Sequence, residues 1–198
     1  GKSLFLSVLR NVLGELAYSA PFSLFDQASR DAHPQNLAQL EGRRFVTAAE
    51  AAENCRLNED RIKALTGGEP ITAHLMREND RTFPNTAKFW LAVNHRPRVL
   101  DESDAFWRRA RLIPFRRRFV PPEILADDPA LARDPAVLPA DKGLSEALKA
   151  ERAGILRWAV AGAVAWRREG LREPESVKAA SQSWRDEADP LGDFLAAC

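Results

Sequence analysis

The sequence predicts an α/β domain built around a parallel sheet. Residues 4–17 place leucine and valine side chains at helical spacing, which indicates an amphipathic helix. Residues 44–50, RFVTAAE, have the composition of a short strand that ends in an acid. Residues 89–93, FWLAV, form an unbroken apolar run, typical of a strand that a parallel sheet buries on both faces. A helix and strands in this order, separated by loops, favour an α/β domain.

Shorter segments extend this pattern. Residues 59–65 fit a short helix, which the Thr-Gly-Gly sequence at 66–68 stops. The β-branched residues within 70–76 favour an extended arm or a hairpin. Residues 111–115, RLIPF, have the composition of a further short strand.

The last third of the chain has a different composition. Residues 120–142 are rich in proline and aspartate and show little periodicity, which indicates a linker or a surface excursion. Ser145 is suited to cap a long helix over residues 146–168, and Gly170 is suited to end it. A second helix is expected over residues 174–188.

The overall composition is that of a soluble, cytoplasmic protein. Its 198 residues are enough for one sizeable domain, and 45% hydrophobic with 29% charged residues is ordinary for such a domain. No apolar stretch approaches the roughly 18 residues that a membrane-spanning helix needs. The two cysteines and three histidines show neither a disulfide framework nor metal-binding spacing.

Basic residues are concentrated in one place although the net charge is only +1. The segment 108–118 carries six arginines and no acid. A basic run of this kind is either a solvated face or a surface for anions or nucleic acid. Both interpretations remain open from the residues alone.

The first three residues, Gly1, Lys2 and Ser3, match the second half of a phosphate-binding loop, G-x-x-x-x-G-K-[ST]. In such a loop backbone N–H groups and a helix N-terminus cradle phosphates, the lysine reaches the β- and γ-phosphates, and the hydroxyl holds Mg²⁺. The tripeptide also occurs by chance. It gains weight because the predicted helix follows it directly.

Polar residues that could complete such a site follow the predicted strands. Glu50 ends the first strand and Glu53 lies three residues on, where acids could orient Mg²⁺ or water, or could simply begin a helix. Asn94 directly follows the strand at 89–93, where it could position the attacking water or serve an ordinary turn.

Arg108 and Arg109 are candidates for an arginine that stabilises the transferring phosphoryl group from a neighbouring subunit. The alternative role is an ion pair with Asp101 or Asp104, worth roughly 0–1 kcal/mol if exposed.

Taken in order, these residues resemble the ATPase domain of superfamily 3 helicases, in the branch found in phage and plasmid primase-helicases and in poxvirus primase-helicases. Five strings carry the resemblance: GKS at 1–3, LEGRRFVTAAE at 40–50, IKALTGGEPITA at 62–73, FPNTAKFWLAVNHRP at 83–97 and DAFWRRARLIPF at 104–115. A weaker echo at 151–162 and 170–177 extends it over nearly the whole chain.

The resemblance implies a role for each candidate residue. Gly1, Lys2 and Ser3 would belong to the Walker A motif, Glu50 to Walker B with Glu53 as a less certain second acid, and Asn94 would be the sensor. Arg109, in preference to Arg108, would be the arginine finger. The cofactors would be ATP and Mg²⁺, with Ser3, Glu50 and Glu53 around the metal ion. The implied DNA-contacting residues, from the family's extra motif and the hairpin that follows it, are Lys63, His74, Arg77 and Arg81.

The resemblance also implies an architecture. An AAA+-like P-loop NTPase core, incomplete at its N-terminus, would occupy residues 1–119, the excursion 120–142 would follow, and residues 143–198 would form a helical C-terminal region. The protein would work as a homo-oligomer, usually a hexameric ring, on single-stranded DNA in the cytoplasm of a bacterial host. It would be the helicase part of a phage, plasmid or prophage replication protein, with no membrane association.

Two departures from the family pattern are visible. His74 stands where relatives often have arginine, which weakens a phosphate contact there at neutral pH. The first half of Walker A is absent, so this segment alone is expected to be inactive. Two rival functions remain open: a non-catalytic DNA-binding or ring-assembly module, and an ATPase that remodels proteins without unwinding DNA.

Overall fold

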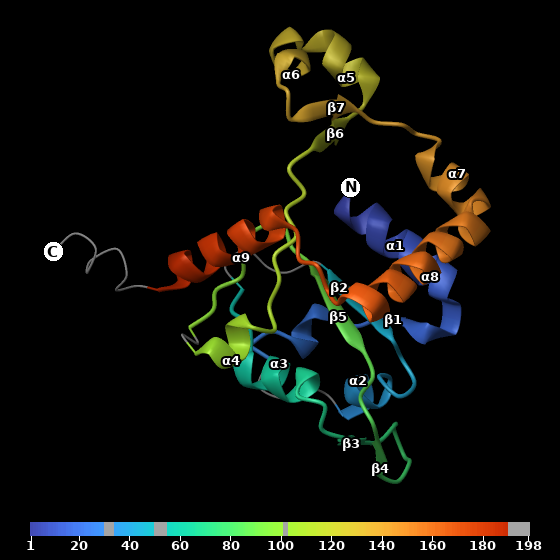
Figure 1. Ribbon diagram of the computed structural model, residues 1–198, viewed down its shortest axis with the longest axis vertical. Coiled ribbons are helices and arrows are strands. Elements are labelled where there is room, and N and C mark those ends of the chain that lie inside the picture. Colours follow the sequence, from blue (N-terminus) through green and yellow to red (C-terminus); the bar gives the residue numbers. More distant parts are fainter. Residues whose placement is uncertain (30–33, 50–54, 101–102, 190–198) are drawn as a thin grey trace, which may run out of the picture. The chain divides into compact units, whose positions relative to one another are not determined.

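A computed structural model describes residues 1–29, 34–49, 55–100 and 103–189 of the protein (Figure 1). The described chain forms two compact units, and the chain passes between them more than once. The first unit comprises Gly1–Leu13 and Pro114–Arg172, and the second comprises Gly14–Ile113 and Glu173–Cys198. The protein is thus a mixed α/β structure, as the sequence predicts, and its three-stranded parallel sheet lies in the second unit.

The sheet of the second unit has three parallel strands in the order β1-β2-β5. These are β1 (Ala17–Ser19), β2 (Phe45–Ala49) and β5 (Lys88–Ala92). β2 is the central strand and is buried along Phe45–Ala48, whereas β5 pairs only with β2 among the described residues and is half-buried over most of its length. The expectation that the FWLAV segment is buried on both faces is therefore wrong in the described chain, because that segment lies at an edge of the sheet.

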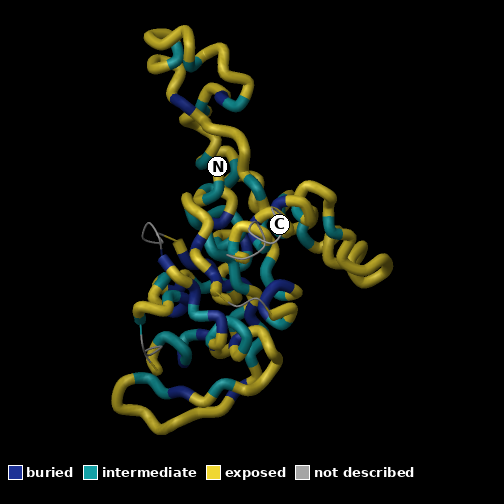
Figure 2. Tube along the Cα trace, turned by 90° about the vertical axis from the view of Figure 1, so that its left-hand side faces the viewer, coloured by how far each residue is buried: buried dark blue, intermediate teal, exposed yellow. Residues whose placement is uncertain are grey.

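Helices and a hairpin surround this sheet. The α-helices of the second unit are α2 (Pro34–Ala38), α3 (Glu59–Thr66), α4 (Asp104–Trp107) and α9 (Glu175–Ala188), and two 3₁₀ turns span Gly14–Leu16 and Phe22–Leu24. β3 (Ile71–Ala73) and β4 (Arg81–Phe83) pair antiparallel, which confirms the hairpin alternative for residues 70–76. The buried hydrophobic residues of the second unit form a cluster that includes Val46 and Ala48 of β2, and Figure 2 shows how burial varies along the chain.

In the first unit, the first helix contacts two later ones. α1 (Lys2–Leu13) packs against α7 (Leu144–Ala150) and α8 (Arg152–Glu169). Between Pro114 and α7 the chain forms a parallel pair, β6 (Arg118–Val120) with β7 (Val137–Pro139), which encloses the short helices α5 (Pro122–Asp127) and α6 (Pro129–Arg133). This Pro- and Asp-rich segment is ordered and largely exposed, at the top of Figure 2.

Three predicted boundaries were wrong for local reasons. The first helix ends at Leu13 because Gly14 takes a left-handed φ of 54°, after which Ala17–Ser19 pair with β2. The long helix expected over residues 146–168 is two helices, broken at Glu151, and Ser145 lies inside the first of them instead of capping it. Gly170 does end the second, with a φ of 74°.

Candidate functional site

The carboxyl ends of β2 and β5 lie side by side. The two strands are parallel and in register to their last residues, where Ala49 pairs with Ala92. Asn94 lies two residues beyond Ala92 and its side chain is exposed. Glu50 follows Ala49 in the sequence, but Glu50 and Glu53 lie outside the described residues. Ligands of open α/β sheets bind beyond the carboxyl ends of such strands, so this edge is the candidate site of the second unit.

Two backbone hydrogen bonds join the segment after Asn94 to the segment that begins at Cys55. The Leu57 N–H donates to the carbonyl of Arg98 at 3.0 Å, and the Arg98 N–H donates to the carbonyl of Cys55 at 2.9 Å. Pro97 and Val99 are buried, while Asn94 is exposed. Asn94 therefore lies at the exposed start of a segment whose later residues are held by backbone hydrogen bonds and by burial.

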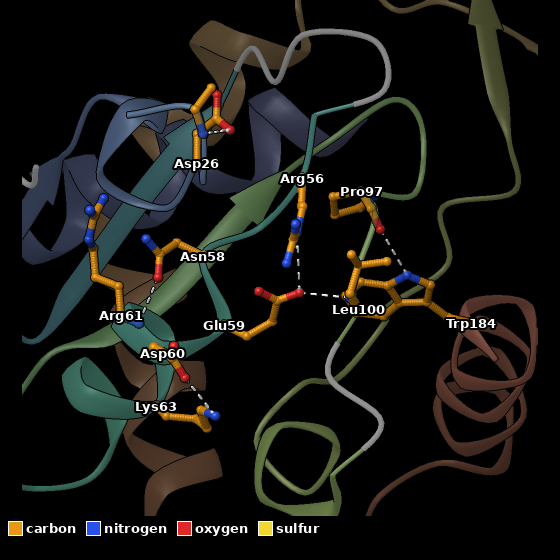
Figure 3. Close-up of polar contacts among 11 residues, drawn as sticks. Asp26, Arg56, Asn58, Glu59, Asp60, Arg61, Lys63, Pro97, Leu100 and Trp184 are labelled. Atoms are coloured by element: carbon orange, nitrogen blue, oxygen red, sulfur yellow. Dashed lines mark hydrogen bonds and ion pairs between the residues drawn. The ribbon is translucent and has the colours of Figure 1, made fainter. Parts of the chain in front are cut away.

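Glu59 adds a buried carboxylate to this junction (Figure 3). Glu59 is only 7% exposed, and its Oε1 accepts a hydrogen bond from the Leu100 N–H at 2.7 Å. Arg56 Nε lies 3.9 Å from the same oxygen. The sequence shows Glu59 only as an acid in the first turn of a predicted helix, so nothing local distinguishes it from a solvated acid. Its burial depends on residues about forty positions away.

Cys55, the other chemically reactive side chain of this junction, is suited to packing. Burial raises the pKa of the Cys55 thiol, and the negative charge of Asp26 raises it further. A raised pKa keeps the thiol protonated at neutral pH, and the thiol is a poorer nucleophile than the thiolate. Cys55 is therefore not a candidate nucleophile.

Arg108 and Arg109 directly follow α4, which is anchored by two buried aromatic residues. Phe106 and Trp107 are 1% and 7% exposed, so the backbone that leads into the arginines is held from inside the fold. Arg108 is exposed, and the guanidinium of Arg109 donates to the carbonyl of Ala105.

The alternative ion pair for these arginines is not formed with Asp104. The carboxylate of Asp104 pairs instead with Arg185 Nη2 of α9, at 2.6 Å. Asp101 lies outside the described residues. Neither Arg108 nor Arg109 is thus tied to Asp104, the nearest acid that the structure describes.

The phosphate-loop residues Gly1, Lys2 and Ser3 lie in the first unit. α1 begins at Lys2, and the Phe5 N–H donates to the carbonyl of Gly1 at 3.0 Å. Gly1 and Ser3 are exposed, Lys2 is half-buried, and no acid stands in the first turn of α1. A helix start with a lysine, a serine and no negative charge is compatible with a phosphate group.

The predicted DNA-contacting residues lie on α3 and on the β3–β4 hairpin. His74 Nδ1 lies 2.8 Å from Asp80 Oδ1, and Lys63 Nζ lies 2.9 Å from Asp60 Oδ1. Arg81 contacts two carboxylates, that of Glu41 at 3.3 Å and that of Glu78 at 3.4 Å. In this structure the side chains of Lys63, His74 and Arg81 all have acidic neighbours, so a phosphate would have to compete with the acids.

Arg77 lies in the connection of the hairpin. It is exposed and adopts a left-handed backbone with φ of 65°, which is unusual for a residue other than glycine. The Thr72 and Thr82 hydroxyls, 2.8 Å apart, hold the two strands together behind it. The hairpin therefore exposes Arg77 to solvent, and the contact between Thr72 and Thr82 stabilises its two strands.

No group of three or more His, Cys, Asp or Glu residues in the described part of the chain is arranged to hold a metal ion. None of the described helices is long and apolar enough to cross a membrane.

Comparison with known proteins places the chain in a family. Over 98% of its length it is 28% identical to a protein of Acanthamoeba polyphaga mimivirus named "Putative helicase L207/L206". The chain spans about a fifth of that relative, 21% of its length. A family model described as "Family of unknown function (DUF5906)" matches residues 1–109, more than half of the chain. The chain therefore belongs to the DUF5906 family.

Proposed function

We propose that this chain is part of an ATP-driven DNA helicase of the superfamily 3 type. The observation that carries the proposal is the register of β2 and β5, whose ends pair at Ala49 and Ala92. In sequence, an acid directly follows the first of these residues and an asparagine lies two positions beyond the second. The similarity to a mimivirus protein named as a helicase supports the same assignment.

Each candidate residue has a chemical role in this proposal. By the resemblance, Lys2 and the start of α1 would bind the phosphates of ATP, and Ser3 and Glu50, with Glu53 as a second acid, would be the ligands of Mg²⁺. The metal ion offsets the negative charge of the phosphates. Glu50 activates the attacking water and Asn94 orients it against the γ-phosphate. Arg109, supplied by a neighbouring subunit, stabilises the charge that develops on the transferred group.

The proposed partner is single-stranded DNA in the channel of a homo-oligomeric ring, with six subunits as the expected number. With a net charge of +1, the protein has no general attraction for nucleic acid, so binding requires basic residues that are gathered at the DNA. The hairpin with His74, Arg77 and Arg81, together with Lys63 on α3, is the proposed contact. Arg77 is the exposed residue of this set that lies in the connection of the hairpin.

The test is Glu50→Gln in the longest native polypeptide that contains this chain. The amide cannot accept the proton of the attacking water, so ATP hydrolysis should fall to background while binding of Mg²⁺ and ATP is retained. Glu146→Gln, the same change at an exposed acid of α7 that pairs with Lys149, is the control and should leave hydrolysis unchanged.

Steady-state hydrolysis and strand displacement are measured side by side. Unchanged hydrolysis in Glu50→Gln contradicts the assignment of Glu50. DNA-stimulated hydrolysis without strand displacement identifies a remodelling ATPase. DNA binding without hydrolysis in the unaltered protein identifies a non-catalytic module.

A further inference from the structure

α9 contacts two segments that carry proposed catalytic residues. Trp184 of α9 is 8% exposed, and its indole Nε1–H donates to the carbonyl of Pro97 at 3.2 Å (Figure 3). The same indole meets Trp107 of α4 in a T-shaped contact, with ring centroids 5.2 Å apart and an interplanar angle of 83°. Pro97 lies three residues after Asn94, and Trp107 immediately precedes Arg108 and Arg109.

Polar contacts of other α9 residues near Trp184 also join the helix to both segments. Towards the Asn94 segment, Arg96 Nη1 donates to Ser183 Oγ at 3.1 Å and also pairs with Glu187. Towards the arginine segment, Arg185 pairs with Asp104 at 2.6 Å. A single helix thus contacts both the segment that precedes residues 101–102 and the segment that follows them.

The attachment continues past the arginines. The Leu112 N–H donates to Ser181 Oγ at 2.9 Å, and Arg111 Nε lies 2.7 Å from Glu173 Oε1, just before α9. This explains why residues 111–115, predicted to be a strand, are not one: the Leu112 N–H is bound by a helix side chain. Arg108 and Arg109 are therefore enclosed between two points, Trp107 and Leu112, that α9 fixes.

We propose that α9 is a positioning element that makes the Asn94 segment and the Arg109 segment move as one body, with Trp184 as its central residue. The consequence of this inference rests on the proposed function. In that function, the state of the nucleotide is sensed at Asn94 and transmitted to Arg109, which acts on the next subunit. The warrant is a continuous path of packed and hydrogen-bonded groups, since coupling requires an element that both ends contact. Trp184 acts through other residues and touches no reacting atom.

Two variants test the element, each with a matched control. Trp184→Phe removes the bond to Pro97 and keeps an aromatic ring, and Trp166→Phe makes the same change on α8, where Trp166 is 58% exposed. Ser181→Ala removes the acceptor of the Leu112 N–H, and Ser176→Ala makes the same change at an exposed position of α9. Ser181→Ala is the milder variant and gives the result if Trp184→Phe does not fold.

The first measurement is amide hydrogen exchange without nucleotide. Trp184→Phe and Ser181→Ala should speed exchange in both segments, 96–100 and 104–112, while the two controls leave both unchanged. Faster exchange in only one segment, or in neither, overturns the proposal. This result does not depend on ATP, so it stands apart from any failure of the proposed function.

The second measurement adds ATP and Mg²⁺. In the unaltered protein, nucleotide should change the exchange of both segments together. In Trp184→Phe the response at 96–100 should persist while that at 104–112 is lost, and kcat should fall about tenfold or more with KM for ATP retained, because the arginine is misplaced but the phosphate loop is untouched. Joint responses in Trp184→Phe overturn the inference. No nucleotide response in the unaltered protein instead contradicts the proposed function.

Discussion

At the scale of single residues, the most consequential contact at the candidate site is made by Glu59. Its carboxylate is buried and accepts a hydrogen bond from the Leu100 N–H, so it joins α3 to the segment that begins at Asn94. A hydrogen bond to a charged group contributes about 1.5–3 kcal/mol, more than the roughly 1 kcal/mol of an average hydrogen bond. Glu59 is therefore expected to matter more for stability than the exposed ion pairs of the surface.

Replacing Glu59 by alanine tests this role. Glu59→Ala leaves the Leu100 N–H without its acceptor and should lower the free energy of unfolding by about 1–3 kcal/mol. Glu59→Gln keeps a carbonyl oxygen at the same place and should lose less. The measurement is chemical denaturation at equilibrium.

Glu175→Ala is the matched control, because Glu175 is also the first residue of its helix but is exposed beside Lys178 at 3.3 Å. Its effect should stay within about 0.5 kcal/mol. Equal losses for Glu59→Ala and Glu175→Ala would show that the buried hydrogen bond contributes nothing.

Residue type alone pointed to the candidate site residues, but not to the residues that hold the segments around them in place. Lys2, Ser3, Asn94 and Arg109 were candidates because each has a chemistry that phosphoryl transfer uses. Glu59, Ser181 and Trp184 have ordinary local settings in the sequence. Their importance comes from a partner far along the chain, such as Pro97 for Trp184, 87 residues away.

At the scale of elements, α3 shows local chemistry that sets a boundary. Asn58 has an extended backbone and its side chain accepts the Arg61 N–H at 2.9 Å, which caps the helix at its first turn. Figure 3 shows this contact beside Glu59. The cap fixes where α3 begins, and hence where Glu59 stands relative to Leu100.

Removing the cap should weaken α3. Asn58→Ala should lower the free energy of unfolding by about 0.5–2 kcal/mol, whereas Asn58→Asp keeps an acceptor oxygen and should cost less. Denaturation gives the free energies, and hydrogen exchange of the Arg61 amide shows whether the loss is local. If Asn58→Ala leaves the Arg61 amide as protected as before, the cap does not hold the helix.

Elements with a clear period or stop signal were predictable, and others were not. The strand at 45–49, the helix at 59–66 and the helix at 175–188 agree with their composition. The segment 111–115 has the composition of a strand, yet the Leu112 N–H is bound by Ser181. A segment needs a neighbour with free backbone groups to become a strand, and sequence composition does not supply that neighbour.

At the scale of the whole molecule, the proposed function requires more than one subunit. In the proposed function Arg109 would act on the nucleotide of a neighbour and Glu50 on that of its own subunit. A proposed active site would therefore combine Glu50 of one chain with Arg109 of the next. This division predicts a behaviour that no single chain can show.

Mixing two inactive variants tests the division. Arg109→Ala and Glu50→Gln should each abolish hydrolysis without preventing assembly, and mixed rings should recover part of it, because some sites then contain both intact residues. Steady-state hydrolysis of mixtures, with assembly followed by native mass spectrometry, is the measurement. Arg172→Ala, a change at an exposed arginine that pairs with Glu169, is the control and should keep full activity. Co-assembly without recovery would contradict a role in trans.

The sequence by itself determined the α/β class, a short strand at 44–50, the final helix and the list of candidate residues, and it left residues 70–76 as an arm or a hairpin. These follow from local chemistry: side-chain period, turn residues and the types of group that bind phosphate. The tertiary structure alone decided that β2 is the central strand and β5 an edge of the described sheet, that Glu59 is buried, and that α9 joins the Asn94 and Arg109 segments. Burial and partner choice depend on contacts between residues distant in the chain, and no local pattern encodes them.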